Sequence, residues 1–251
     1  QIMAKFEIGD GNFDIEVGVD PDYEALEMKV GSYINAEGKV VRDAADAVGI
    51  VFKMEAIGSD VPANYPVALQ GKTIAGYAVA IENVATGRQV LNNAAMSSLV
   101  TTDATVTNGT QATDALLTGI GEVAFMTTYN SWVNEHPLDG ESLSSWYIPT
   151  VDQLGEFMGM LFKIGEVEPT GGQAFREMPE FAFENGVMFD RDPIESVYYA
   201  SCTVNGSKDI SGVIINVDKT TKQVLDAKAS SLKVTGSSQK ALCRPMITIF
   251  K

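Results

Sequence analysis

Two kinds of apolar periodicity divide the chain into successive parts, and their order limits the folds that it can adopt. Period-two alternation, typical of a half-buried strand, marks Phe13–Val19, and a further strand is predicted at Leu26–Ile34. Continuous apolar runs at Ala47–Met54 and Ile74–Ile81 are consistent with buried strands. Helical spacing is confined to the middle of the chain, at about 121–135 and 150–162. Strand patterns return from Ser196 to Phe250. Because strands and helices are segregated along the chain, the sequence predicts an α+β domain rather than a parallel α/β sheet.

Local signals mark the ends of the predicted helices. His136-Pro137 ends the first helix, because the residue before a proline disfavours helical conformation. Thr150-Val-Asp-Gln153 opens the second helix as a capping box, in which each side chain bonds to the other residue's backbone amide. Trp146, which shortly precedes this box, is predicted to be buried beside the second helix. Residues 92–118 are predicted to form a long Thr-rich loop, and such loops are often functional.

The charge of the chain restricts its partners. Acidic residues number 33 and basic residues 18, which gives a formal net charge of −15. Nucleic-acid binding requires clustered Lys and Arg, and we find no such cluster. We therefore exclude nucleic acid, and we disfavour anionic membranes and sulfated polysaccharides. No apolar run approaches the roughly 18 residues of a spanning helix, so we expect no membrane span.

Residues that could carry chemistry are few. The chain has two cysteines, Cys202 and Cys243, and one histidine. Two cysteines are too few for a four-Cys zinc site or for a disulfide-rich scaffold. The cysteines are either joined by a structural disulfide or are two buried thiols. His136 is predicted to lie on the surface, where its charge would complement the helix C-terminus. With no nucleophile elbow in the sequence, we predict that the chain is not an enzyme.

Two segments match ligand-binding motifs only in part. Asp190, Asp192 and Glu195 could supply oxygen ligands to calcium, but a solvated acidic turn is the favoured interpretation. Gly119-Ile-Gly121-Glu-Val-Ala124 fits half of a dinucleotide fingerprint, yet no strand is predicted before it. We predict no cofactor, and calcium at the acidic turn is the one alternative.

Six short segments resemble, in chain order, the motifs of one group of bacterial surface domains. They are VGSYINAEG at 30–38, VGIVF at 48–52, GYAVA at 76–80, WYIPT at 146–150, YYASCT at 198–203 and CRPM at 243–246. The group includes the C-terminal domain of collagen-like adhesins and the Fibrobacter paralogous domain, as found in Bacteroidetes lipoproteins, and it is similar to formylglycine-generating enzymes. The resemblance implies a C-type-lectin-like fold over residues 30–251, with two helices against antiparallel sheets. Residues 1–29 lie outside it and are predicted to be an N-terminal β extension.

The same resemblance implies a function, and it implies that two strands lie next to each other. It implies a non-enzymatic binding module, on the cell surface or secreted, for a protein or neutral glycan ligand. It also implies that the strands carrying Cys202 and Cys243 are adjacent. One alternative is a phage tail or pilus-tip receptor-binding protein. Another is a divergent formylglycine-generating-type enzyme, although its close cysteine pair is absent here, where the two cysteines are 41 positions apart.

Two predicted loops form the candidate ligand surface, because binding residues are often found on loops held by a rigid scaffold. The first loop supplies the polar residues Asn92, Asn93, Asp103 and Asn108. The second, at 170–192, supplies Phe175, Arg176, Phe181, Phe189 and Arg191. The phenylalanines could be apolar anchors for a ligand, or they could cover the core beneath the loop.

Overall fold

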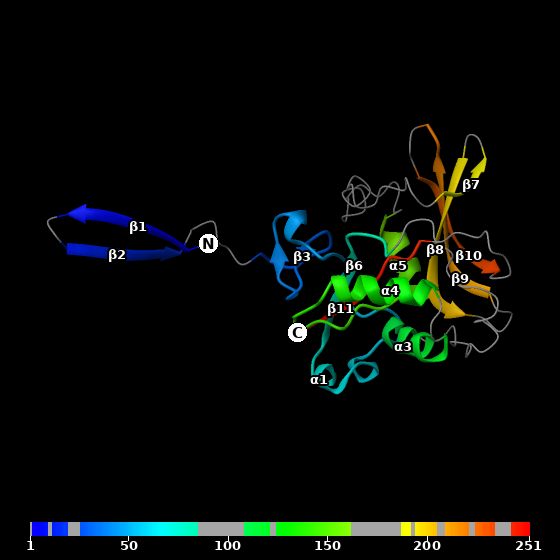
Figure 1. The fold of residues 1–251 in the computed structure, drawn as a ribbon, viewed down its shortest axis with the longest axis horizontal. Helices are drawn as coiled ribbons and strands as arrows, with labels where there is room; N and C mark the ends of the chain where they lie inside the picture. The colour runs from blue at the N-terminus through cyan, green and yellow to red at the C-terminus, as the bar shows by residue number, and fades with distance from the viewer. Residues whose placement is uncertain are drawn as a thin grey trace.

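The computed structural model of the chain describes residues 2–9, 12–19, 26–84, 108–120, 124–161, 187–191, 194–204, 209–220, 224–233 and 242–251. The described residues form helices and antiparallel sheets, which confirms the α+β prediction (Figure 1). A four-stranded sheet stands at one end of the molecule and a two-stranded hairpin projects at the other (Figure 1). A five-stranded sheet and the helices lie between them.

The five-stranded sheet has the strand order β11-β6-β5-β3-β4, and all its neighbouring strands are antiparallel. Its strands are β3 (Tyr33–Ile34), β4 (Val40–Val41), β5 (Gly49–Lys53), β6 (Ile74–Ala80) and β11 (Met246–Phe250). Every residue of β6 and β11 is buried. The short strand β4 forms one edge of the sheet.

The other two sheets are also antiparallel. The four-stranded sheet has the order β10-β9-β8-β7 and consists of β7 (Val187–Arg191), β8 (Ile194–Val204), β9 (Asp209–Asp218) and β10 (Val224–Lys233). The hairpin consists of β1 (Ile2–Gly9) and β2 (Asn12–Val19). Leu242 links the two larger sheets, because its amide donates to the carbonyl of Tyr198 at 2.8 Å shortly before the chain enters β11.

Helices cover the five-stranded sheet. The longer ones are α3 (Gly109–Ile120), α4 (Ala124–Glu135) and α5 (Val151–Leu161), and the short ones are α1 (Val67–Gln70), η1 (Ala44–Asp46) and η2 (Pro62–Asn64). One apolar cluster joins Val51, Ala78 and Ile247 to Trp132 of α4. A second joins Phe52 and Val79 to Phe157 of α5 and to the four-stranded sheet. Alternate residues of the central strands therefore pack on both faces of the sheet.

The second predicted helix begins as expected. The amide of Gln153 donates to Thr150 Oγ1 at 3.2 Å, and the amide of Thr150 donates to Gln153 Oε1 at 3.0 Å. The predicted capping box is therefore confirmed at the start of α5. Trp146 is 5% exposed, which confirms its burial, but it packs against Trp132 of α4, with ring centroids 5.1 Å apart.

Two predictions of local structure are wrong. Residues 109–118 of the predicted loop at 92–118 belong to α3, which begins at Gly109 because the side chain of Asn108 accepts the amide of Thr110 at 2.7 Å as an N-cap. Residues 92–107 of that loop lie outside the described residues. The predicted strand from Leu26 to Ile34 is reduced to β3, because Gly31 has a φ of 91° and turns the chain.

Candidate functional site

A groove of about 360 Å³ lies at the edge of the five-stranded sheet that β4 forms. Its walls come from the segment that precedes β3 and from the β3–β4 hairpin: Leu26, Glu27, Lys29, Gly31, Ser32, Tyr33, Val40, Val41 and Arg42. Among the described residues no strand pairs with the outer side of β4. The groove therefore combines a volume within the usual range of ligand sites with a strand edge that can accept backbone hydrogen bonds.

A tight turn fixes the β3–β4 wall of the groove. The Asn35 side chain accepts the amides of Glu37 at 3.1 Å and Lys39 at 3.0 Å, which closes the turn. Gly38 within this turn has a φ of 80°, and a Cβ there would lie 2.9 Å from a side-chain carbon of Leu143. Only glycine meets both requirements without strain. The wall is thus held in place by the sequence of the turn.

The opposite wall is attached to the central sheet. The Lys29 amide donates to Ser32 Oγ at 3.0 Å, and the Ser32 amide donates to the Lys29 carbonyl at 2.9 Å. Gly31 donates to the carbonyl of Val51 in β5 at 2.8 Å. These bonds hold the position of Lys29, while Leu26 at the end of the wall remains 41% exposed.

The charge of the groove differs in sign from that of the whole chain. Lys29 and Arg42 are exposed cations and Glu27 is an exposed carboxylate, so the groove carries two positive charges against one negative. The chain as a whole carries −15. The groove can therefore bind an extended segment by its backbone and favour one that bears carboxylates.

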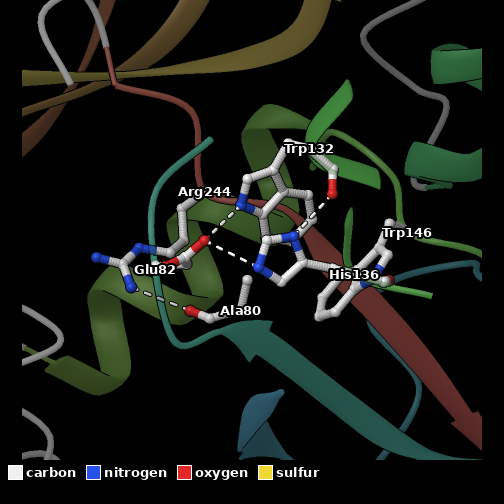
Figure 2. Close-up of polar contacts among 6 residues, drawn as sticks. All are labelled: Ala80, Glu82, Trp132, His136, Trp146 and Arg244. Carbon is white, nitrogen blue, oxygen red and sulfur yellow. Dashed lines mark hydrogen bonds and ion pairs between the residues drawn. The ribbon is translucent and has the colours of Figure 1, made fainter. Parts of the chain in front are cut away.

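A second polar cluster lies at the C-terminal end of α4 (Figure 2). Glu82 Oε1 accepts the indole N–H of Trp132 at 2.8 Å and lies 3.0 Å from His136 Nε2. His136 Nδ1 lies 2.7 Å from the carbonyl oxygen of Trp132, and the imidazole stacks on the Trp132 indole with centroids 4.2 Å apart.

This cluster has a structural role. The contact between His136 Nδ1 and the Trp132 carbonyl places the imidazole at the C-terminal end of α4, and the predicted charge complement there stays a prediction. Its side chain is only 29% exposed, however, so it is less of a surface residue than predicted. The indole of Trp146 donates to the His136 carbonyl at 2.8 Å, and the buried Arg244 donates to the carbonyl of Ala80 at 3.0 Å (Figure 2). The contacts of Trp132 and His136 with Glu82 and Trp146 fix the end of α4, whereas the Arg244 bond joins the segment before β11 to the end of β6.

Asp60 is a buried carboxylate that the sequence analysis did not select. It is 3% exposed and accepts the hydroxyls of Tyr65 at 2.5 Å and Tyr77 at 2.7 Å, and the side-chain amide of Asn108 at 3.2 Å. Burial raises the pKa of Asp60 above the ordinary range of a carboxyl group. A raised pKa can mark a functional site. Here the donors come from three separate segments, so the carboxylate joins parts of the core.

The two cysteines are buried thiols, and no disulfide joins them. Backbone bonds from Leu242 to Tyr198 and from Ala200 to Leu242 place the two cysteine-bearing segments side by side, as the resemblance implies. Burial raises the pKa of Cys202, and it raises the pKa of Cys243 to about 12. Both are therefore weak nucleophiles at neutral pH. Whether they oxidise stays a prediction.

One predicted ligand residue is corrected by the structure. Asn108 is 1% exposed, because it caps α3 and donates to Asp60, so it does not belong to a surface loop. Several other candidates lie outside the described residues: Asn92, Asn93, Asp103, Phe175, Arg176, Phe181 and Asp192.

The remaining candidates lie on a described hairpin. Phe189, Asp190 and Arg191 are in β7, and Glu195 is in β8. The register places Asp190 opposite Glu195 and Arg191 opposite Ile194. Among the described residues no group of three or more His, Cys, Asp or Glu side chains is placed to hold a metal ion. Calcium at this hairpin stays a prediction.

The sequence analysis did not find the groove, although one signal was present. Residues 29–42 contain three basic residues, Lys29, Lys39 and Arg42, and one acidic residue, Glu37, within a strongly acidic chain. That local excess of positive charge marks the segment. Only the strand order shows that the segment also forms the edge of a sheet.

The fold and the groove together define an α+β domain with antiparallel sheets and an accessible sheet edge. Comparison with family models, with curated proteins and with solved structures finds no match for this chain. In the described part of the chain, none of the helices has both the length and the apolar character needed to cross a bilayer.

Proposed function

We propose that the chain is a binding module for protein ligands, displayed on the cell surface or secreted, and that it holds an extended ligand segment in the groove beside β4. A C-type-lectin-like arrangement of residues 30–251 belongs to the same proposal. The observation that carries the proposal is a groove lined by residues of β3 and β4, at the end of the five-stranded sheet where no described strand pairs with the outer side of β4. An extended peptide can add to such an edge through main-chain hydrogen bonds, while the neighbouring side chains select its sequence.

The side chains of the groove favour an acidic polypeptide. Leu26, Val40 and Val41 offer apolar contact, and Lys29 and Arg42 offer two cations. Carboxylates on the ligand would pair with these cations, whereas the acidic remainder of the surface would repel the same ligand elsewhere. A neutral sugar would use neither the strand edge nor the charges, and for this reason we prefer a protein ligand to a glycan.

A phage-displayed library of random peptides, selected on the immobilised chain, tests the proposal. We expect enriched peptides to carry Asp or Glu, and we expect the double variant Lys29→Glu with Arg42→Glu to weaken their binding at least about tenfold, which corresponds to roughly 1.4 kcal/mol. The matched control is Lys228→Glu, which reverses an exposed lysine of β10 far along the chain from the groove. Fluorescence polarisation with a labelled enriched peptide gives the affinities.

Two results would contradict the proposal. One is that the enriched peptides bind the double variant as tightly as the unmodified chain. The other is a glycan-array signal that the double variant abolishes while no peptide is enriched, which would replace the protein ligand with a sugar.

A further inference from the structure

The helices α3 and α5 both begin at a side-chain amide whose orientation is fixed. Asn108 Oδ1 accepts the amide of Thr110 at 2.7 Å at the start of α3, and Gln153 Oε1 accepts the amide of Thr150 at 3.0 Å at the start of α5. Because the oxygen of each side chain is occupied by its own helix, the NH2 group must point the other way. Both NH2 groups donate to buried partners.

Three buried hydroxyl groups connect the Gln153 side chain to Asp60, and we call them the hydroxyl relay. Gln153 Nε2 donates to the hydroxyl of Tyr147 at 3.1 Å. That hydroxyl lies 3.0 Å from Thr248 Oγ1, which in turn lies 2.7 Å from the hydroxyl of Tyr65. The Tyr65 hydroxyl donates to Asp60 Oδ2 at 2.5 Å. Each residue of the relay is 3% exposed or less, so its hydrogen bonds are shielded from water.

Asp60 receives donors on both carboxylate oxygens. Tyr65 and Tyr77 donate to Oδ2, and the side chain of Asn108 donates to Oδ1 at 3.2 Å. The uncharged side chain of Asn64 lies 3.5 Å from Oδ1. Among the described residues no cationic side chain forms an ion pair with Asp60. These contacts suit an ionised carboxylate, because it only accepts hydrogen bonds.

The ionised carboxylate sets the direction of the hydroxyl relay, because each hydroxyl has one hydrogen to donate. Tyr65 gives its hydrogen to Asp60. Thr248 must therefore donate to Tyr65, and Tyr147 must donate to Thr248. The NH2 group of Gln153 completes the series by donating to Tyr147. In this direction every hydroxyl of the relay both accepts and donates.

Protonation of Asp60 conflicts with this direction. A proton from solvent forms an O–H bond on the carboxyl group, no other covalent bond forms or breaks, and the new hydrogen needs an acceptor. Oδ1 faces the NH2 group of Asn108, which is a donor, so the hydrogen belongs on Oδ2. Tyr77 already accepts the amide of Ile57 at 3.2 Å, whereas Tyr65 can accept once its own hydrogen turns toward the next hydroxyl. Protonation therefore favours reversal of the relay.

Reversal of the relay ends at the start of α5. When the three hydroxyls reverse, the hydrogen of Tyr147 faces the NH2 group of Gln153, which is also a donor. Turning the Gln153 side-chain amide over removes this conflict. The turned amide, however, places its NH2 group against the backbone amide of Thr150 and breaks one half of the capping box.

We infer that Asp60 acts as a proton-linked conformational device: the ionised carboxylate orders the hydroxyl relay that holds Gln153 in the capping box of α5, and protonation reverses the relay and releases that half of the box. The titratable groups that face Asp60 are Tyr65, Tyr77 and, further along the relay, Tyr147. Burial raises the pKa of all three phenols. In acid, Asp60 is therefore the member of this cluster that changes charge.

An NMR titration of the full-length, isotope-labelled chain from neutral to acid pH tests the inference. The carboxyl carbon of Asp60 reports its protonation. The Thr150 amide reports the bond to Gln153, and the Thr110 amide reports the direct connection through Asn108. We expect both amide signals to shift with the midpoint of the Asp60 carboxyl, because both helix starts depend on its ionised form.

Tyr147→Phe interrupts the hydroxyl relay and keeps the aromatic ring. In this variant we expect the Thr150 amide to stop following Asp60, while the Thr110 amide still follows it. The matched control is Tyr129→Phe, because Tyr129 is also a buried tyrosine and its hydroxyl donates to a backbone carbonyl outside the relay. In the control both amides should follow Asp60.

Thr248→Val interrupts the relay at the next hydroxyl, and it replaces Tyr147→Phe if that variant lacks the dispersed spectrum of a folded protein. Three results would overturn the inference. The first is a Thr150 amide that does not shift as Asp60 titrates in the unmodified chain. The second is a Thr150 amide that still follows Asp60 in the interrupted variants, because the charge then acts through space. The third is an Asp60 carboxyl that stays ionised until the chain unfolds in acid.

Discussion

At Asp60, one carboxylate connects segments that are far apart in sequence. Tyr65 follows η2, Tyr77 lies in β6, and Asn108 begins α3, and all three donate to this single side chain. Tyr65 also shares a hydrogen bond of 2.7 Å with Thr248 of β11. An unpaired buried carboxylate would be costly, but a carboxylate with this many donors is tolerated and positions its neighbours.

The raised pKa of Asp60 predicts how stability depends on pH. Because the folded state holds the proton of this group more strongly than the unfolded state, its contribution to stability is largest in acid and is lost as pH rises through the folded pKa. Asp60→Asn removes this contribution and also leaves donors without partners, at a cost of about 1–3 kcal/mol. In urea unfolding, the stability difference between the unmodified chain and Asp60→Asn should therefore be larger at pH 4 than at pH 7.

The exposed Asp43 provides the control for this titration. Asp43→Asn should change stability by less than about 0.5 kcal/mol at either pH, as surface substitutions usually do. A stability difference for Asp60→Asn that grows from pH 4 to pH 7 would contradict the assigned direction of the pKa.

Burial of both cysteines predicts low thiol reactivity in the folded chain. Cys202 is 0% exposed and Cys243 is 1% exposed, and burial raises the pKa of each thiol. A thiol-specific chromogenic reagent at pH 8 should therefore react slowly with the folded protein and rapidly with two thiols after denaturation. Rapid reaction in the folded state would contradict the burial, and fewer than two thiols after denaturation would contradict the two free thiols of the structure.

At the scale of single elements, α5 shows how a local signal becomes a packed helix. The capping box at Thr150 and Gln153 sets its first turn, and Leu154, Phe157 and Met158 then pack into the core with exposures of 3% or less. The Gln153 side chain also donates to the hydroxyl of Tyr147 at 3.1 Å. The start of the helix is therefore held by a side-chain hydrogen bond to Tyr147 as well as by its own backbone.

Thr150→Ala should destabilise the chain by about 1 kcal/mol, because the amide of Gln153 loses its acceptor. Thr150→Ser keeps the hydroxyl and should retain most of the stability. Urea unfolding of both variants measures the difference. Equal losses for the two substitutions would show that the hydroxyl does not cap the helix.

Elements defined by local patterns could be predicted from the sequence, and elements defined by distant contacts could not. The alternation at Phe13–Val19 and the capping box at Thr150 were sufficient to predict β2 and the start of α5. The helix α3 was not predicted, because Asn108-Gly109 resembles a turn and Thr residues are weak helix formers. Residues that are distant in sequence stabilise this part of the helix. Asn108 donates to Asp60, and Thr113 accepts the Ile148 amide at 2.8 Å.

The candidate site was missed for a related reason. Lys29 and Arg42 are ordinary exposed cations when the sequence is considered alone. They become members of one groove only because β4 pairs with β3 and ends the sheet. Strand order is a property of the whole fold, and no spacing in the sequence encodes it.

At the scale of the whole molecule, the distribution of charge connects the groove to its proposed ligand. The chain carries −15 overall, whereas the groove carries two cations and one carboxylate. An acidic ligand segment is therefore guided away from most of the surface and toward this edge. Salt screens such interactions, so binding in the groove should weaken as ionic strength rises.

Hydrogen exchange of the full-length chain, with and without a saturating enriched acidic peptide, tests the central claim most directly. A ligand strand beside β4 would occupy its backbone groups, so we predict slower amide exchange within residues 26–42. Exchange within β8 and β9 should stay unchanged and serves as the internal reference. Protection confined to other segments, with residues 26–42 exchanging at the same rate as in the free chain, would contradict the assignment of the groove as the binding site.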